Sequence, residues 1–187
     1  DAFMADCAFQ KNDKSINVGI PYSQLEAEIR SRKPDIVGIS GPFTCQIENS
    51  IKTSTLVKEV DSSILTVVGG PHVTTVPKEF LEEAKNVDIA VVGEGEYAML
   101  DIAHYFEGSK PINEIKGIAY RKNGNILVNP SRPFLENLDE LPYPAYHLVD
   151  MEKYLGPQKI GYRSFQDRAI SMITSRGCPF NCCFCAV

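Results

Sequence analysis

The sequence predicts an α/β domain of flavodoxin-like type, in which helices cover both faces of a parallel sheet. Short apolar segments alternate with helical segments between residues 20 and 108, and each apolar segment runs into a loop that contains glycine. Such alternation is typical of parallel strands joined by crossover helices. With 187 residues, 43% of them hydrophobic, the chain is large enough to bury a core of ordinary size.

Four segments carry helical patterns. The first, 22–34, has Ser23 and Glu26 in the spacing of a capping box, and Pro34 ends it. Pro77 occupies the first turn of a later helix, where proline is tolerated, and Gly108 ends the last one. The other three helices are expected over 47–60, 77–85 and 97–108.

Three strands are expected between these helices, over 35–40, 64–70 and 87–96. Their carboxyl ends read "SGPFT", "GGPHV" and "GEGE". Ligands of open α/β sheets bind at the carboxyl ends of the strands, and glycine permits close approach of the backbone. These three loops are therefore the expected ligand site.

The pattern changes after residue 109. "KGIAYRKNGNILVN" predicts a β-hairpin with Asn123 and Gly124 in its turn. A proline-rich linker follows over 130–144, and 168–177 is expected to be one more apolar strand, which leads directly into a group of cysteines.

Composition excludes several classes of protein. The net charge is −5 and the pI about 5.3, so no basic face for nucleic acid is expected. No apolar run approaches the roughly 20 residues that span a bilayer, and the first residues do not resemble a signal peptide. A cytoplasmic protein is therefore expected.

Four of the six cysteines lie between residues 178 and 185, whereas Cys7 and Cys45 are isolated and are expected to be small buried residues. A tight group indicates metal or redox chemistry rather than a disulfide framework. Cys178, Cys182 and Cys185 have the spacing Cys-x3-Cys-x2-Cys, and an iron–sulfur cluster on three thiolates keeps one iron open to an outside ligand. A structural zinc site is the alternative, although zinc prefers four ligands and no second cysteine pair is present.

This motif, preceded by an expected strand and with an aromatic residue at 184, resembles that of the radical S-adenosylmethionine (SAM) superfamily. The resemblance implies a 4Fe–4S cluster held by Cys178, Cys182 and Cys185, with SAM on the open iron. It also implies that Cys183 is not a ligand.

The segments "DIVGIS", "VVGGPHVTTVP", "DIAVVGEGEYAMLDI", "IKGIAYRKNGNI" and "LDELPYPAYHL" extend the resemblance to the cobalamin-binding radical SAM class, most of all to its magnesium-protoporphyrin IX monomethyl ester cyclase group. This implies an oxidative cyclase that cleaves SAM reductively. The alternatives are a cobalamin-dependent radical SAM methyltransferase and a non-catalytic module that carries cobalamin or a metal. The implied partners are a small-molecule substrate such as a porphyrin and a reductant protein such as a ferredoxin or flavodoxin.

The same resemblance implies which residues hold cobalamin, and it assigns no catalytic residue. Ser40 would lie beside the dimethylbenzimidazole tail, the glycine pair after the second strand would lie along the nucleotide tail, and the last loop would close over it. His72 is a less favoured cobalt ligand, because such histidines follow the first strand of this fold. The implied cofactor-binding residues are Ser40, Gly69, Gly70, Gly93, Glu94 and Gly95. A response-regulator domain is disfavoured because the strand ends carry glycines in place of acidic residues.

Three regions follow from this interpretation: a partial cobalamin domain over 1–110, the hairpin and linker over 111–166, and the start of a radical SAM domain over 167–187. We expect the chain to be an inactive piece of a longer enzyme that binds cobalamin weakly by itself. The strand 35–40 would then be a bare sheet edge. Either the chain dimerises through that edge, or residues 1–20 cover it.

Overall fold

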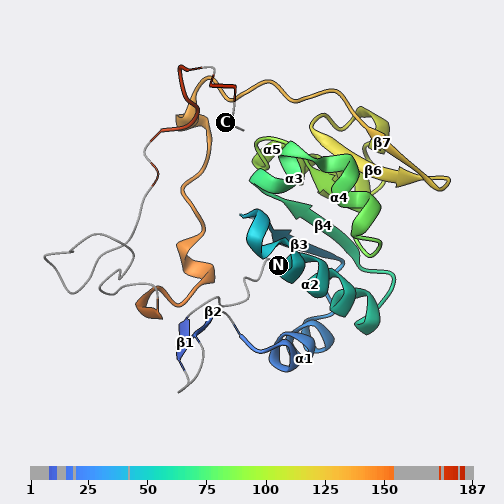
Figure 1. Cartoon of the computed structure of the whole chain (residues 1–187), viewed down its shortest axis with the longest axis vertical. Helices are drawn as coiled ribbons and strands as arrows, with labels where there is room; N and C mark the ends of the chain where they lie inside the picture. Colours follow the sequence, from blue (N-terminus) through green and yellow to red (C-terminus); the bar gives the residue numbers. More distant parts are fainter. Residues whose placement is uncertain are drawn as a thin grey trace, which may run out of the picture. The chain divides into compact units, whose positions relative to one another are not determined.

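The computed structural model describes residues 9–11, 16–18, 20–41, 43–153, 173, 175–180 and 182–183 (Figure 1). The chain divides into two compact units. One unit comprises Glu26–Leu138 and holds a five-stranded sheet with its helices. The other comprises Asp1–Leu25 and Asp139–Val187, and it includes the cysteine group.

The sheet has the strand order β3-β4-β5-β6-β7. Its first three strands, β3 (Ile36–Ser40), β4 (Leu65–Gly69) and β5 (Ile89–Val91), are parallel. The last two, β6 (Ile118–Lys122) and β7 (Asn125–Val128), are antiparallel. The parallel α/β prediction is thus confirmed. The expected hairpin also forms, and it extends the same sheet, because β6 pairs with β5.

The hairpin turn has the expected chemistry. Asn123 and Gly124 have φ angles of 51° and 79°. Positive φ at both central residues is the requirement of a type I′ turn, whose twist matches that of the two strands. The turn therefore sets the register, in which Lys122 pairs with Asn125.

The described residues contain five α-helices: α1 (Tyr22–Arg32), α2 (Ile47–Val60), α3 (Pro71–Thr75), α4 (Pro77–Glu83) and α5 (Glu96–Phe106). Four correspond to predicted helices, and α3 is an additional short one. The capping box is wrong. The carbonyl of Pro21 accepts the N–H groups of Gln24 and Leu25, so α1 begins at Tyr22 and Ser23 lies inside its first turn, and Glu26 pairs instead with Arg30 at 2.8 Å.

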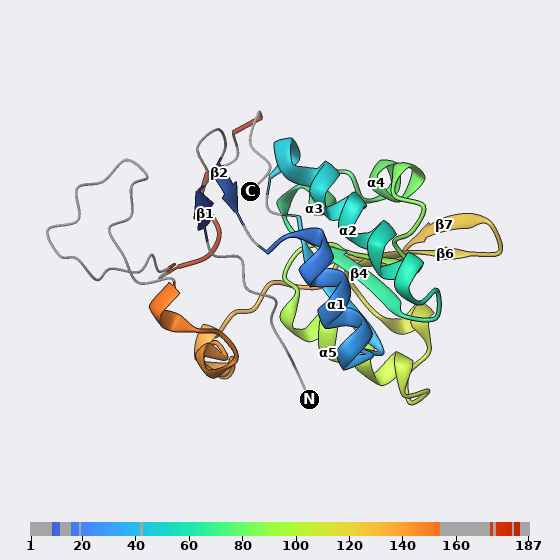
Figure 2. The same ribbon diagram turned by 90° about the horizontal axis from the view of Figure 1, so that it is seen from below.

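Two apolar clusters form the core, one on each face of the sheet. Figure 2 shows α2 and α4 on one side of the sheet and α5 on the other. Successive strand residues point to opposite faces, so the neighbours Val67 and Val68 of β4 belong to different clusters. The cluster under α2, α3 and α4 contains Ile47, Val68, Val73, Phe80, Leu81, Ala84, Val87, Ala90 and Ala119. The cluster under α5 contains Val67, Ile89, Val91, Ala98, Ile102, Ile115, Ile118 and Tyr120.

A partly buried polar contact joins the hairpin to α4. The guanidinium of Arg121, on β6, donates to the carbonyl oxygens of Leu81 and Ala84, the latter at 3.1 Å. The last carbonyls of a helix have no partner within the helix, so Arg121 satisfies the carboxyl end of α4 from outside. The hairpin is therefore fastened to the helix layer as well as to β5.

In the second unit, β1 (Phe9–Lys11) and β2 (Ile16–Val18) form an antiparallel pair. The strand expected over 168–177 falls largely outside the described residues, as do Cys7 and Cys185. Within the part of the chain that the structure describes, no helix is long and apolar enough to cross a bilayer.

Candidate functional site

The structure brings the predicted cofactor residues together at one end of the sheet. Ser40, the last residue of β3, pairs in register with Gly69, and Gly69 pairs with Val91 at the end of β5. The loops after the three parallel strands are therefore adjacent. The strand ends and these loops together carry Ser40, Gly69, Gly70, Gly93, Glu94 and Gly95.

Gly70 makes a close backbone contact with the loop after β3. It has φ 125°, and a Cβ atom at this position would lie 2.5 Å from the carbonyl oxygen of Gly41. The N–H of Gly41 in turn donates to the carbonyl of Gly69 at 2.6 Å. Only glycine fits here, because both the conformation and the space exclude a side chain. The contact between the two loops is enough to explain why residue 70 is glycine, without a ligand.

Gly93 has a different environment. Its φ is 82°, and no atom lies within 4 Å of the position that a Cβ would occupy. Ser40 is exposed at the end of β3, and its hydroxyl has no hydrogen-bond partner among the described residues. An open stretch of backbone and an unused hydroxyl fit a cofactor whose polar tail lies along the strand ends.

Two threonines join the loops to one another. Thr44 Oγ1 lies 3.0 Å from His72 Nδ1, which links the loop after β3 to α3. Thr74, on α3, accepts the N–H of Gly93 at 3.0 Å. Sequence reasoning missed both residues; the available signal was a hydroxyl side chain beside a strand end, where it bonds neighbouring backbone or side chains.

His72 belongs to this framework. Besides the contact with Thr44, its ring meets the ring of Phe80 edge-on, with centroids 6.3 Å apart and an interplanar angle of 87°. The histidine thus packs onto the core under α4, and we assign it no cobalt.

Small side chains bring α2 close to the site. Ser50 is buried on α2, and its hydroxyl donates to the carbonyl of Ser40 at 3.2 Å. Gly41 leaves room for Ile47, which would approach a Cβ at 3.0 Å. A larger residue at position 41 or 50 would push the loop after β3 away from the helix.

The loop after β5 is bonded to a distant segment. Glu94 Oε2 accepts the backbone N–H of Leu135 at 2.8 Å. Nearby, Asp101 on α5 pairs with Lys110 at 2.6 Å and with Arg132. Burial raises the pKa of Asp101, but the hydrogen bonds and positive charges of Lys110 and Arg132 outweigh it, so the pKa is lowered overall.

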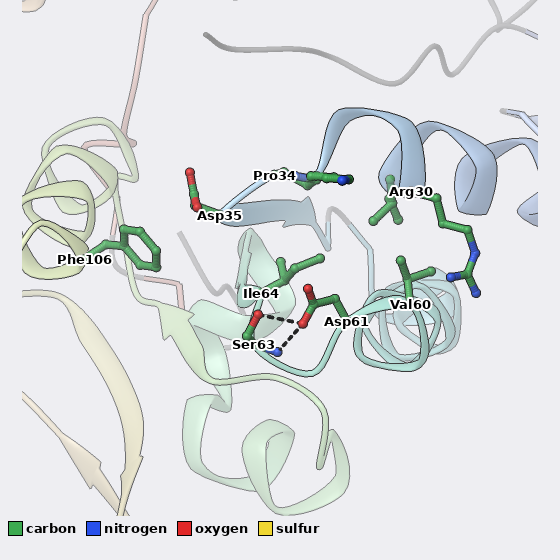
Figure 3. Close-up of a pocket in the computed structure, with 10 residues that line it drawn as sticks. Arg30, Pro34, Asp35, Val60, Asp61, Ser63, Ile64 and Phe106 are labelled. Atoms are coloured by element: carbon green, nitrogen blue, oxygen red, sulfur yellow. Dashed lines mark hydrogen bonds between the residues drawn. The ribbon is translucent and has the colours of Figure 1, made fainter.

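A groove of about 540 Å³ lies elsewhere, at the amino ends of β3 and β4 (Figure 3). Asp61, one of its two acidic residues, accepts hydrogen bonds from the hydroxyl and the backbone N–H of Ser63, at 2.6 and 2.8 Å, and these bonds lower its pKa. Open α/β sheets bind ligands at the opposite end, so the groove is distinct from the candidate site. It is lined by Ile29, Arg30, Lys33, Pro34, Asp35, Val60, Asp61, Ser63, Ile64 and Phe106.

The structure describes two of the three predicted cluster ligands. Cys178 and Cys182 are free and exposed, as is Cys183. Within the described residues no three metal-binding side chains converge. Cys45 is also exposed, so its expected burial is wrong; it lies in a short 3-10 turn (Thr44–Gln46) on the surface.

A parallel-rich sheet with open glycine loops at its strand ends defines a cofactor-binding domain of Rossmann-like class. Residues 5–103, just over half of the chain, match the B12 binding domain family, and the chain belongs to this family. Its homologues include enzymes of the cobalamin-dependent radical SAM family.

The chain is 32% identical to an uncharacterized methyltransferase of Pyrococcus horikoshii, over 99% of this chain and 39% of the relative. It is 34% identical to the anaerobic magnesium-protoporphyrin IX monomethyl ester cyclase of Rubrivivax gelatinosus, over 87% of this chain and 29% of the relative. The solved structure of the cobalamin-dependent SAM radical enzyme OxsB has the same fold. It matches with a TM-score of 0.53 and 21% identity, over 61% of this chain and 16% of that one. The chain thus spans about two-fifths or less of these proteins.

Proposed function

We propose that this chain supplies the cobalamin-binding domain and the cluster-binding loop of a cobalamin-dependent radical SAM enzyme. One observation carries the proposal: the loops after β3, β4 and β5 meet at one end of the sheet, with an exposed serine and an open glycine backbone on it. Membership of the B12 binding domain family supports cobalamin as the ligand of this end.

The residues proposed to hold the cofactor have different tasks. Ser40 has the exposed hydroxyl, and Gly93 leaves backbone open to an approaching group, while Gly95 ends the loop at the start of α5. Gly69 and Gly70 shape the floor between them through their contacts with Gly41. Cobalamin, when bound, supplies a cobalt centre for group transfer, and this chain binds and orients it.

Cys178, Cys182 and Cys185 are the proposed cluster ligands. Three thiolates in Cys-x3-Cys-x2-Cys spacing suit an iron–sulfur cluster with one open iron, at which SAM is cleaved reductively. The two cysteines of this set that the structure describes are exposed and free. A reductant protein such as a ferredoxin or flavodoxin would supply the electron.

Methyl transfer is the reaction we propose first. The Pyrococcus methyltransferase aligns over nearly the whole chain, hairpin and linker included. An oxidative cyclase acting on a small molecule such as a porphyrin is the second candidate, supported by the 34% identity to the Rubrivivax cyclase. A non-catalytic cobalamin carrier would keep the loops of the sheet but would not cleave SAM.

Two assays on a longer protein that carries this chain test the proposal. Titration with hydroxocobalamin, followed by the visible spectrum, should show saturable binding that is weaker in the 187-residue chain. After anaerobic reconstitution, the protein should convert SAM to 5′-deoxyadenosine and lose its iron and sulfide when Cys178, Cys182 or Cys185 is replaced by Ala. Cys183→Ala is the matched control and should keep the cluster. Absence of cobalamin binding by the longer protein would refute the proposal.

A further inference from the structure

The carboxylate of Glu94 holds a segment that lies 41 residues further along the chain. Glu94 is the middle residue of the loop 93–95, and its Oε2 accepts the N–H of Leu135 at 2.8 Å in a partly buried contact. A carboxylate that accepts a main-chain N–H forms a charge-assisted bond, roughly twice as strong as a neutral one. We call residues 129–135 the strap.

The strap is attached to the same unit at three further places. The side-chain amide of Asn129 donates to the carbonyls of Ile112 and Ile115, each at 2.8 Å. The carbonyl of Pro130 accepts the N–H of Gly117 at 2.9 Å. Arg132 pairs with Asp101 on α5. These contacts place the strap beside α5, so Glu94 meets a segment that is already positioned.

The loop 93–95 is held at its two ends. Before it, the N–H of Val92 donates to the carbonyl of Gly117 at 2.8 Å, and Gly93 donates to Thr74. After it, the carbonyl of Gly95 accepts the first backbone bond of α5, from Met99 at 2.8 Å. Gly93, whose backbone is open, is therefore the direct sequence neighbour of Glu94, which bonds the strap.

We propose that Glu94 is a positioning residue that latches the loop 93–95 onto the strap, so that cofactor in the loop and a docked strap stabilise each other. The inference rests on the proposed cobalamin function and refines it. Glu94 acts on the cofactor through Leu135 and does not touch it. Because coupling between two sites is reciprocal, undocking the strap weakens cobalamin binding by the factor by which cobalamin strengthens docking.

The first experiment needs no cofactor. Hydrogen exchange of the Leu135 amide is measured in the 187-residue chain for the wild type, Glu94→Ala and Glu94→Gln. We expect Glu94→Ala to accelerate exchange at least about tenfold, and Glu94→Gln, which keeps an acceptor oxygen, to do so less. The amide of Val92, bonded to Gly117 in the same region, is the internal control and should not change. Unchanged exchange at Leu135, or equal acceleration at Val92, would overturn the latch.

The second experiment separates a latch from a direct contact. Hydroxocobalamin is titrated against the longer protein as wild type, Glu94→Ala, Leu135→Pro and Leu135→Ala. Leu135→Pro removes the N–H that Glu94 accepts, whereas Leu135→Ala keeps it. We expect Leu135→Pro to weaken binding as much as Glu94→Ala does, and Leu135→Ala to bind as the wild type does.

The outcomes are distinguishable. If Glu94→Ala weakens cobalamin binding and Leu135→Pro does not, Glu94 acts on the cofactor directly and the inference is wrong. If cobalamin slows Leu135 exchange in the wild type by the same factor, reciprocity supports the latch. If the wild type binds no cobalamin at all, the proposed function fails, and the exchange of Leu135 still decides whether Glu94 holds the strap.

Discussion

Replacing Gly70 by alanine tests the framework of the site most directly. Gly70 has φ 125° and ψ 176°, a region used almost only by glycine, where another residue costs about 1–3 kcal/mol. The added Cβ would also lie 2.5 Å from the oxygen and 2.9 Å from the carbon of the Gly41 carbonyl. Both atoms are backbone, so no side-chain rotation relieves the overlap.

We expect Gly70→Ala to lower the free energy of unfolding by about 3 kcal/mol or more, a large part of the roughly 5–15 kcal/mol of an ordinary domain. Gly93→Ala is the matched control. It also has positive φ, but nothing lies within 4 Å of its Cβ position, so only the conformational cost of about 1–2 kcal/mol is expected.

Urea unfolding of the two variants and the wild type, followed by far-UV circular dichroism, provides the comparison; the chain has no tryptophan to report by fluorescence. The reasoning is refuted if Gly70→Ala destabilises the chain no more than Gly93→Ala does. That result would mean that the loops after β3 and β4 separate easily, and that the strand-end surface is not a fixed platform for a cofactor.

Three further predictions concern the scaffold. Arg121→Met should lower the free energy of unfolding by about 1–3 kcal/mol, because the carbonyl of Leu81 on α4 loses its donor, although that of Ala84 keeps the N–H of Val87; exposed Lys122→Met should change little in the same urea assay. The folded-state pKa of Asp101 is lowered, so its contribution to stability is present above the unfolded pKa near 3.8 and is lost as the pH falls through the folded value. Between neutral pH and pH about 2, the melting temperature should therefore fall less steeply with pH for Asp101→Asn than for the wild type. Equal slopes of melting temperature against pH would contradict the ion-pair assignment. We also propose that the chain self-associates through β3, which pairs only with β4 among the described strands; light scattering should give a dimer that Gly38→Lys converts to a monomer, and a wild-type monomer at every concentration would count against it.

The parallel part of the fold was predictable from the sequence, because the strands there are short apolar runs with helical segments between them. The turn at Asn123 and Gly124 was predictable for a local reason, since type I′ geometry demands those residues. What could not be read was the pairing of β6 with β5, because register between distant strands depends on tertiary contacts such as that of Arg121 with α4. The false capping box has a similar cause, because both groups of the expected box have other partners. The Pro21 carbonyl accepts the first N–H groups of the helix, and Arg30 pairs with Glu26.

The candidate site was predictable in position but not in the tasks of its residues. The resemblance implies the same role for six residues, and the structure divides them by their surroundings. The backbone of Gly41 occupies the space where a Cβ of Gly70 would lie, whereas the same position at Gly93 is open. Glu94 accepts the N–H of Leu135. These roles cannot be told apart from the sequence, because a glycine required for close backbone packing and a glycine that leaves room for a ligand are the same letter.

The contacts at the strand ends form a series that runs through the loops in chain order. Gly41 meets Gly69 and Gly70, Thr74 on α3 meets Gly93, and Glu94 meets Leu135 on the strap. The first two links join one strand-end loop to the next, and the third joins the last loop to the strap. The last link leaves the sheet for the segment that leads in sequence to the cysteines. Under the proposed latch, a cofactor on these loops would act on the strap without a contact of its own with it, through the bond between Glu94 and Leu135.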